Sequence, residues 1–113
     1  RNFLFEQVIK TSMSWGNINN MMYVVGATRP DWIKKIRKII PDHFLLVPGI
    51  GAQGGNLGKV SDYGLNEHCG LLVNASRSVI FADITNKFDQ AARNKALEIQ
   101  QEMQIHLKRK KIL

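Results

Sequence analysis

Cysteine is almost missing from this sequence, which has Cys69 alone among its 113 residues. A single cysteine cannot form a disulfide within the chain, and it excludes cysteine-rich metal sites. The three histidines have no cysteine or histidine partner at metal-ligand spacing, so we expect no metal site. Low cysteine usage is typical of a reducing compartment, and we therefore expect a cytoplasmic protein.

Long hydrophobic runs are missing as well. The longest apolar stretch, Met21 to Val25, is far shorter than the about 20 residues that a membrane-spanning helix needs. Acidic residues are few, because 9 Asp and Glu stand against 16 Lys and Arg, for a net charge of +7. The basic residues gather within 34–38 and 108–111, where a solvated helix face and a basic helix end explain them. Since no nucleic-acid-binding motif accompanies them, we expect neither a nucleic acid nor a membrane partner.

The length limits what the chain can build. A chain of 113 residues forms one hydrophobic core at most. Apolar residues make up 44% and charged residues 22%, which are ordinary values for a globular protein. A complete (β/α)8 barrel takes about 250 residues, so the chain is too short for one.

Short apolar runs alternate with amphipathic segments along the chain. The apolar runs predict strands that are buried on both faces, over 21–25, 44–47 and 70–73. Helical spacing of apolar residues predicts helices, over 2–15, 30–40, 57–63, 79–82 and 87–110, with Thr28 as the cap of the second. The alternation predicts an α/β fold with three parallel strands and covering helices, and the strand spacing suits the C-terminal half of a TIM (β/α)8 barrel.

The most unusual segment follows the second predicted strand. Pro48–Gly55 contains four glycines: Gly49, Gly51, Gly54 and Gly55. Glycine lets the backbone approach a phosphate closely, because it has no Cβ and adopts positive φ without strain. Arg77 follows the third strand and can offer a planar fork of donors to phosphate oxygens. Since barrel enzymes often bind phosphate at the last two strand ends, the pattern predicts a phosphate site.

Two other interpretations of the glycines stay open. The glycines can simply form a tight turn, with Arg77 as a surface charge. The spacing Gly49-x-Gly51-x-x-Gly54 also fits the dinucleotide-binding fingerprint. That fingerprint needs an acidic residue near the end of the next strand, where this chain has Asn74-Ala75, so the dinucleotide interpretation is disfavoured.

Three segments together resemble a known family. They are Val25-Gly26-Ala27-Thr28, Leu46-Val47-Pro48-Gly49-Ile50-Gly51-Ala52-Gln53-Gly54-Gly55 and Leu72-Val73-Asn74-Ala75-Ser76-Arg77-Ser78-Val79-Ile80. They are similar to the final strands of orotidine 5'-phosphate decarboxylase in its bacterial type 2 branch. The resemblance implies a TIM barrel that converts orotidine 5'-phosphate to UMP in pyrimidine biosynthesis, without a cofactor or metal, and usually as a homodimer.

The resemblance also implies roles for single residues. Gln53 would reach the substrate phosphate across the closed loop, and Arg77 would pair with the same phosphate. A backbone N–H at Ser76 or Arg77 would lie beside it, and Pro48 would lie against the base. Other branches of the family carry glycine at the position of Ser76, which leaves a backbone contact intact.

The catalytic residues of that family are missing from the chain. The family carries two Lys and two Asp around an Asp-x-Lys-x-x-Asp motif, which does not occur in residues 1–113. We therefore expect 1–113 to be the phosphate-binding, C-terminal half of one barrel domain whose N-terminal half is absent, and to be inactive alone. The alternatives are another phosphate-binding barrel lyase or isomerase, or a noncatalytic half-barrel that binds phosphate or nucleic acid.

Overall fold

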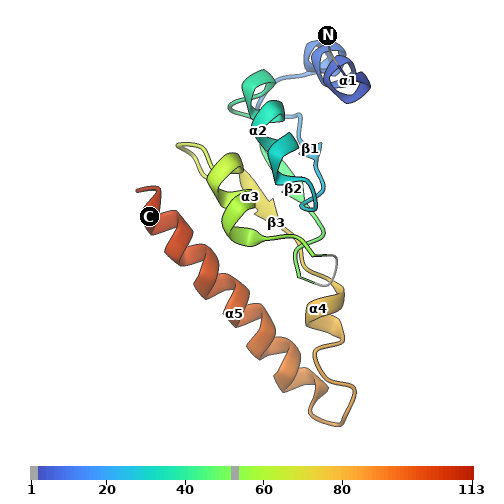
Figure 1. Ribbon diagram of the computed structural model, residues 1–113, viewed down its shortest axis with the longest axis vertical. Helices are drawn as coiled ribbons and strands as arrows, with labels where there is room; N and C mark the ends of the chain where they lie inside the picture. Colours follow the sequence, from blue (N-terminus) through green and yellow to red (C-terminus); the bar gives the residue numbers. More distant parts are fainter. Residues whose placement is uncertain (1–2, 52–53) are drawn as a thin grey trace.

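A computed structural model describes residues 3–51 and 54–113, and its centre is a parallel sheet (Figure 1). The strands are β1 (Tyr23–Val24), β2 (Leu45–Val47) and β3 (Leu71–Val73), in the spatial order β1-β2-β3. Both strand pairs are parallel, as the sequence predicts. Each strand is shorter than the apolar run that contains it.

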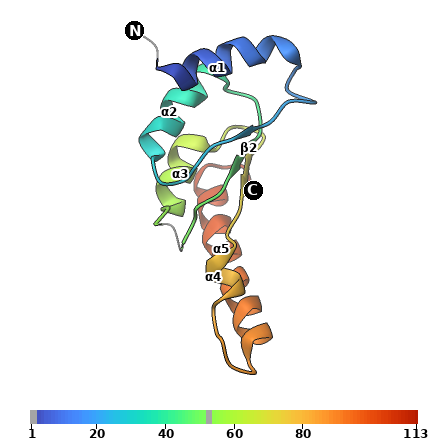
Figure 2. The same ribbon diagram turned by 90° about the vertical axis from the view of Figure 1, so that its right-hand side faces the viewer.

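Helices connect the strands and follow them. They are α1 (Leu4–Ser12), the 3-10 helix η1 (Met13–Trp15), α2 (Pro30–Ile39), α3 (Leu57–Gly64), α4 (Arg77–Ile80) and α5 (Phe88–Arg109). Figure 2 shows α2 and α3 on one side of the strands, while α4 lies beyond their carboxyl ends. In the described part of the chain, no helix combines the length and apolarity that a membrane crossing needs.

One face of the sheet is packed and the other is open. On the packed face, Leu45 and Val47 are fully buried, and Leu71 is nearly so. On the open face Val24 lies opposite Leu46, which lies opposite Leu72, and Val24 and Leu72 are 70% and 49% exposed. The prediction of strands buried on both faces is therefore wrong for β1 and β3 in this structure, because the helices cover one face.

Two helix starts differ from the predicted ones. Arg29, and not Thr28, holds the N-cap position of α2, with Pro30 in the first turn. The short helix after β3 begins at Arg77 instead of residue 79, so Arg77 is the first residue of α4. This shift places the Arg77 side chain at the end of the helix that faces the strand ends.

Arg37 is the largest departure from the expected solvated helix face. Its side chain is half-buried, and burial lowers the pKa of its guanidinium. Nε donates to the Gly64 carbonyl at 2.7 Å, and Nη2 donates to the Gly70 carbonyl at 2.8 Å. Nη1 donates to the carbonyls of Ile40 and His43 at 3.0 and 2.6 Å. One side chain thereby joins the segments that enter β2 and β3 to α2 and α3.

The absence of a side chain at Gly70 leaves room for the Arg37 guanidinium. Its φ is +71°, and a Cβ at this position would lie 2.5 Å from Nη2 of Arg37. A side chain at residue 70 would therefore displace the guanidinium from its carbonyl partners.

Part of the basic C-terminal run is also bound within the protein. Arg109 pairs with the Asp62 carboxylate at 2.6 Å, and Lys110 donates to the Asp62 carbonyl at 3.1 Å. These contacts fix the end of α5 against α3, so two of the four terminal basic residues have structural partners.

Replacing Arg37 by lysine should destabilise the protein. Lysine keeps the charge, but its single ammonium group cannot donate hydrogen bonds to four separated carbonyls. Hydrogen bonds from charged groups contribute about 1.5–3 kcal/mol each. We expect Arg37→Lys to lower the free energy of unfolding of the full-length protein by about 2 kcal/mol or more in urea denaturation. Arg93→Lys, an exposed change on α5, is the matched control. Equal stability of the two variants would contradict the role given to Arg37.

Candidate phosphate-binding site

The loops that leave the three strands are joined to one another at the carboxyl edge of the sheet. The Ala27 N–H, after β1, donates to the Pro48 carbonyl at 2.9 Å. The Asn74 N–H, after β3, donates to the Val47 carbonyl at 3.0 Å. Because the strands are parallel, all three loops lie at the same edge, and these bonds hold them together.

The Gly-rich loop closes on itself. The Gly55 N–H donates to the Gly49 carbonyl at 2.9 Å, and the Gly54 N–H donates to the Gly51 carbonyl at 2.8 Å. Gly49, Gly51 and Gly54 have φ values of +95°, +83° and +85°. These conformations are strained for residues with a Cβ, so glycine is required for the shape of the loop.

Glycine is required at residue 55 because its neighbours leave no room for a side chain. A Cβ at this position would lie 2.6 Å from the Cβ of Ala27 and 3.0 Å from the carbonyl carbon of Gly49. The small side chain of Ala27 and the missing side chain of Gly55 let the first two loops come together.

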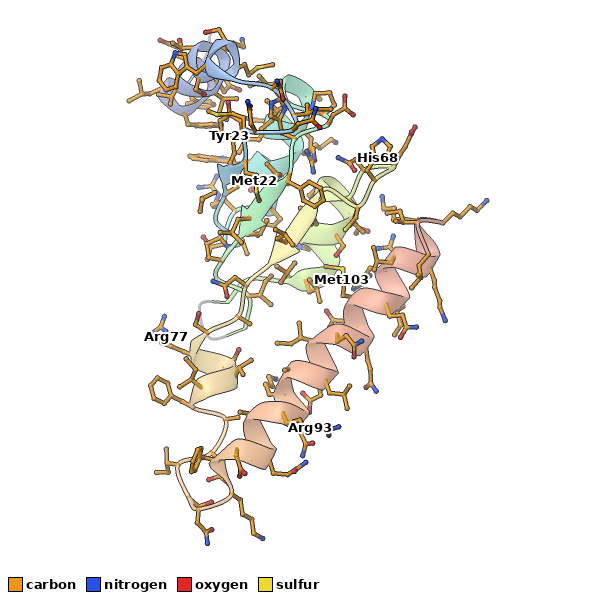
Figure 3. All side chains as sticks on the ribbon, turned by 180° about the vertical axis from the view of Figure 1, so that it is seen from behind. Met22, Tyr23, His68, Arg77, Arg93 and Met103 are labelled. Carbon is orange, nitrogen blue, oxygen red and sulfur yellow. The ribbon has the colours of Figure 1, made fainter. Side chains whose placement is uncertain are left out.

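The third loop brings α4 to the Gly-rich loop. A Cβ on Gly51 would lie 2.9 Å from Oγ of Ser78, so the loop and the first turn of α4 are in direct contact. Arg77 precedes Ser78, and Figure 3 shows its side chain extending from the start of α4 into open space. The first N–H groups of a helix have no partner within it. The guanidinium of Arg77, and the N–H groups of Arg77 and Ser78, which donate to none of the described residues, therefore lie next to a loop rich in glycine.

The structure thus gathers most of the predicted site residues at one edge. The four glycines and Pro48 lie on the loop after β2, and Ser76 and Arg77 lie at the start of α4 after β3. Gln53 lies outside the described residues. What each of them binds stays a prediction. Within 3–51 and 54–113, His, Cys, Asp and Glu side chains form no group of three that could hold a metal.

Sequence reasoning missed two residues of this edge. Ala27 was part of the family-like Val25–Thr28 segment, but its packing against Gly55 needs three-dimensional information. Ser78 was part of the Ser-Arg-Ser motif, and its contact with Gly51 could not be seen from the spacing.

Comparison with curated proteins finds close relatives, although no family model matches the chain. The chain is 54% identical over 111 residues to the orotidine 5'-phosphate decarboxylase of Porphyromonas gingivalis (strain W83), covering 98% of this chain and 40% of that protein. It is 56% identical over 105 residues to the decarboxylase of Bacteroides fragilis, covering 93% and 38%. The chain therefore spans about two fifths of the length of these relatives.

Solved structures give the same picture. Leishmania donovani UMP synthase matches with a TM-score of 0.70 and 37% identity, over 88% of this chain and 22% of that one. Leishmania donovani OMP decarboxylase matches with a TM-score of 0.68 and 33% identity, over 88% and 38%. These matches confirm the resemblance, and they confirm that the three parallel strands and their helices have the fold of part of a TIM barrel.

Adding one methyl group at Gly55 should disturb the joined loops. Its Cβ would press against the Gly49 backbone and Ala27, and overpacking of this kind costs about 1–3 kcal/mol. We expect Gly55→Ala to lower the free energy of unfolding by that amount in urea denaturation. Gly26→Ala is the matched control, because a Cβ there meets none of the described atoms within 4 Å. If Gly55→Ala is as stable as Gly26→Ala, the loops are not as tightly joined as the structure indicates.

Proposed function

We propose that this chain is the phosphate-binding part of an orotidine 5'-phosphate decarboxylase. That reaction removes CO2 from C6 of orotidine 5'-phosphate and gives UMP, a step of de novo pyrimidine biosynthesis. The observation that carries the proposal is the contact between the Gly-rich loop and the helix that begins at Arg77. The loop and the helix both lie in a chain 54% identical to a relative with that name.

The chemistry of the edge suits a phosphate ester. The Arg77 guanidinium can donate two parallel hydrogen bonds to phosphate oxygens, which a lysine cannot do in a fixed plane. The backbone at Ser76 and Arg77 adds N–H donors at the same place. Gln53 would contact the phosphate from the loop, and Pro48 would lie against the base, its carbonyl already fixed by Ala27.

The catalytic step itself belongs to residues outside this chain. In the family it resembles, a Lys protonates the carbanion left at C6, and the Lys and Asp residues that do this lie in a motif that 1–113 lacks. The phosphate is remote from C6, so its contacts accelerate the reaction by binding and aligning the substrate. Binding energy at this edge would therefore be used to bring the base against the catalytic groups.

The open face of the sheet supports a single barrel domain completed by further residues. Val24, Leu46 and Leu72 form an apolar row that no helix of the described residues covers. An apolar groove of about 690 Å³ flanks the outer edge of β1, and another of about 560 Å³ lies between β3 and α5. Bare strand edges and an apolar face need partners. The extra length of the relatives would supply the remaining strands of the barrel.

Two further properties belong to the same proposal. The resemblance supports a homodimer with orotidine 5'-phosphate and UMP as its ligands. A location in the cytoplasm is supported by the single cysteine, which suits a reducing compartment.

Removing the Arg77 side chain tests the proposed function. The full-length protein should convert orotidine 5'-phosphate to UMP, followed by the change in ultraviolet absorbance. We expect Arg77→Ala to lower kcat/KM about ten- to a hundredfold, because a hydrogen bond from a charged group contributes about 1.5–3 kcal/mol. If the wild-type protein does not convert this substrate, the proposed activity is wrong.

Arg93→Ala is the control for this measurement. Figure 3 shows Arg93 on α5, on the side of that helix turned away from α4. Its removal takes away the same charge and should leave kcat/KM unchanged. If both variants lose activity equally, the effect comes from net charge and not from a contact with phosphate.

Cysteine labelling tests the proposal that further residues cover the open face of the sheet and complete a single barrel. Leu72 is 49% exposed here, and the proposal covers it with further strands in the full-length protein. We therefore expect the Leu72→Cys variant to react with a thiol reagent at least tenfold more slowly than Gln101→Cys, an exposed change on α5. The native Cys69 is present in both variants and sets the background. Equal labelling rates would show that the apolar row stays open.

A further inference from the structure

Ser78 has an unmet hydrogen-bonding capacity at the edge of the proposed site. It is the second residue of α4, directly after Arg77. Its Oγ is shielded from solvent and has no hydrogen-bond partner among the residues that the structure describes. Buried hydroxyl groups nearly always have a partner, so this one needs an explanation.

Other serines of the chain show the local solution that Ser78 does not use. Serines in helices commonly donate to a carbonyl three or four residues earlier. Ser12 donates to the Ile9 carbonyl at 3.0 Å, and Ser14 donates to the Thr11 carbonyl at 2.8 Å. The Ser78 hydroxyl instead lies toward the Gly-rich loop, where a Cβ on Gly51 would be 2.9 Å away.

The position of this hydroxyl indicates what it can bind. It lies between a loop whose glycines let the backbone come close and the residue that carries a guanidinium. The Arg77 guanidinium offers several hydrogen-bond donors and attracts anions, and a hydroxyl can add one more donor. A phosphate oxygen is the acceptor that all these donors have in common.

We propose that Ser78 is a further phosphate-binding residue, whose hydroxyl donates to a phosphate oxygen of the substrate between Gly51 and Arg77. This inference rests on the proposed function, since it takes orotidine 5'-phosphate as the substrate. It also gives a second reason for glycine at residue 51. Besides its φ of +83°, any side chain there would occupy the space in front of the Ser78 hydroxyl.

Ser78→Ala in the full-length protein tests the inference. We expect kcat/KM for orotidine 5'-phosphate to fall roughly tenfold, because the lost donor served a charged group. For the nucleoside orotidine, which lacks the phosphate, kcat/KM should stay unchanged. The melting temperature without ligand should be unchanged or higher, since alanine removes a buried hydroxyl that had no partner. Ser61→Ala, at a buried serine of α3 away from the loop, should change neither kcat/KM.

The outcomes separate the inference from the proposed function. Equal loss with both substrates, no loss with either, or a lower melting temperature without ligand would overturn the role of Ser78. If the wild-type protein does not decarboxylate orotidine 5'-phosphate, inorganic phosphate is the probe, followed by its effect on the melting temperature. Stabilisation of the wild type but not of Ser78→Ala would then support the inference while the proposed activity fails. No stabilisation of the wild type would overturn both.

Discussion

Four backbone carbonyls converge on the guanidinium of Arg37, and the arrangement of the sheet depends on this contact. The carbonyls belong to the end of α2, the segment before β2, the end of α3 and the residue before β3. A guanidinium presents its donors in one fixed plane, so it holds these four segments at fixed relative positions. Because β2 and β3 are parallel, this contact at their starts also helps to align the loops that leave their carboxyl ends.

The two edges of the sheet are held by different means. At the starting edge a half-buried charge is satisfied by carbonyl dipoles, which offset part of the cost of removing it from water. At the carboxyl edge the connections are backbone hydrogen bonds, and the side chains are mostly small or missing, as at Ala27 and Gly55. That difference leaves the carboxyl edge without large side chains at these contacts, while the starting edge is filled by the Arg37 side chain.

The sequence predicted the order of elements, the parallel sheet and the place of the Gly-rich loop, because apolar periodicity and glycine content are local signals. It did not predict the role of Arg37. The four carbonyls that accept from its guanidinium lie at separate places in the chain, and no sequence pattern shows that the fold brings them together. Burial of both sheet faces was predicted from uniformly apolar strands. Val24 and Leu72 are exposed because the described chain brings helices to one face alone. The contact of Ser78 with Gly51 likewise depends on how the Gly-rich loop and the start of α4 lie in space, which the sequence does not show.

Several of the basic residues have partners within the chain, at separate positions. Arg37 binds carbonyls, and Arg109 with Lys110 binds Asp62. Arg29 and Lys35 lie over the rings of Trp32 and Phe3, at 4.4 and 4.8 Å from the ring centres. These residues stabilise the fold by contacts within the chain. Arg77 differs from them in position, because it stands at the carboxyl edge beside a loop whose shape requires glycine. A net charge of +7 would suggest a broad anionic partner. Under the proposed function, Arg77 instead binds a single small anion, the substrate phosphate, at one edge of the sheet.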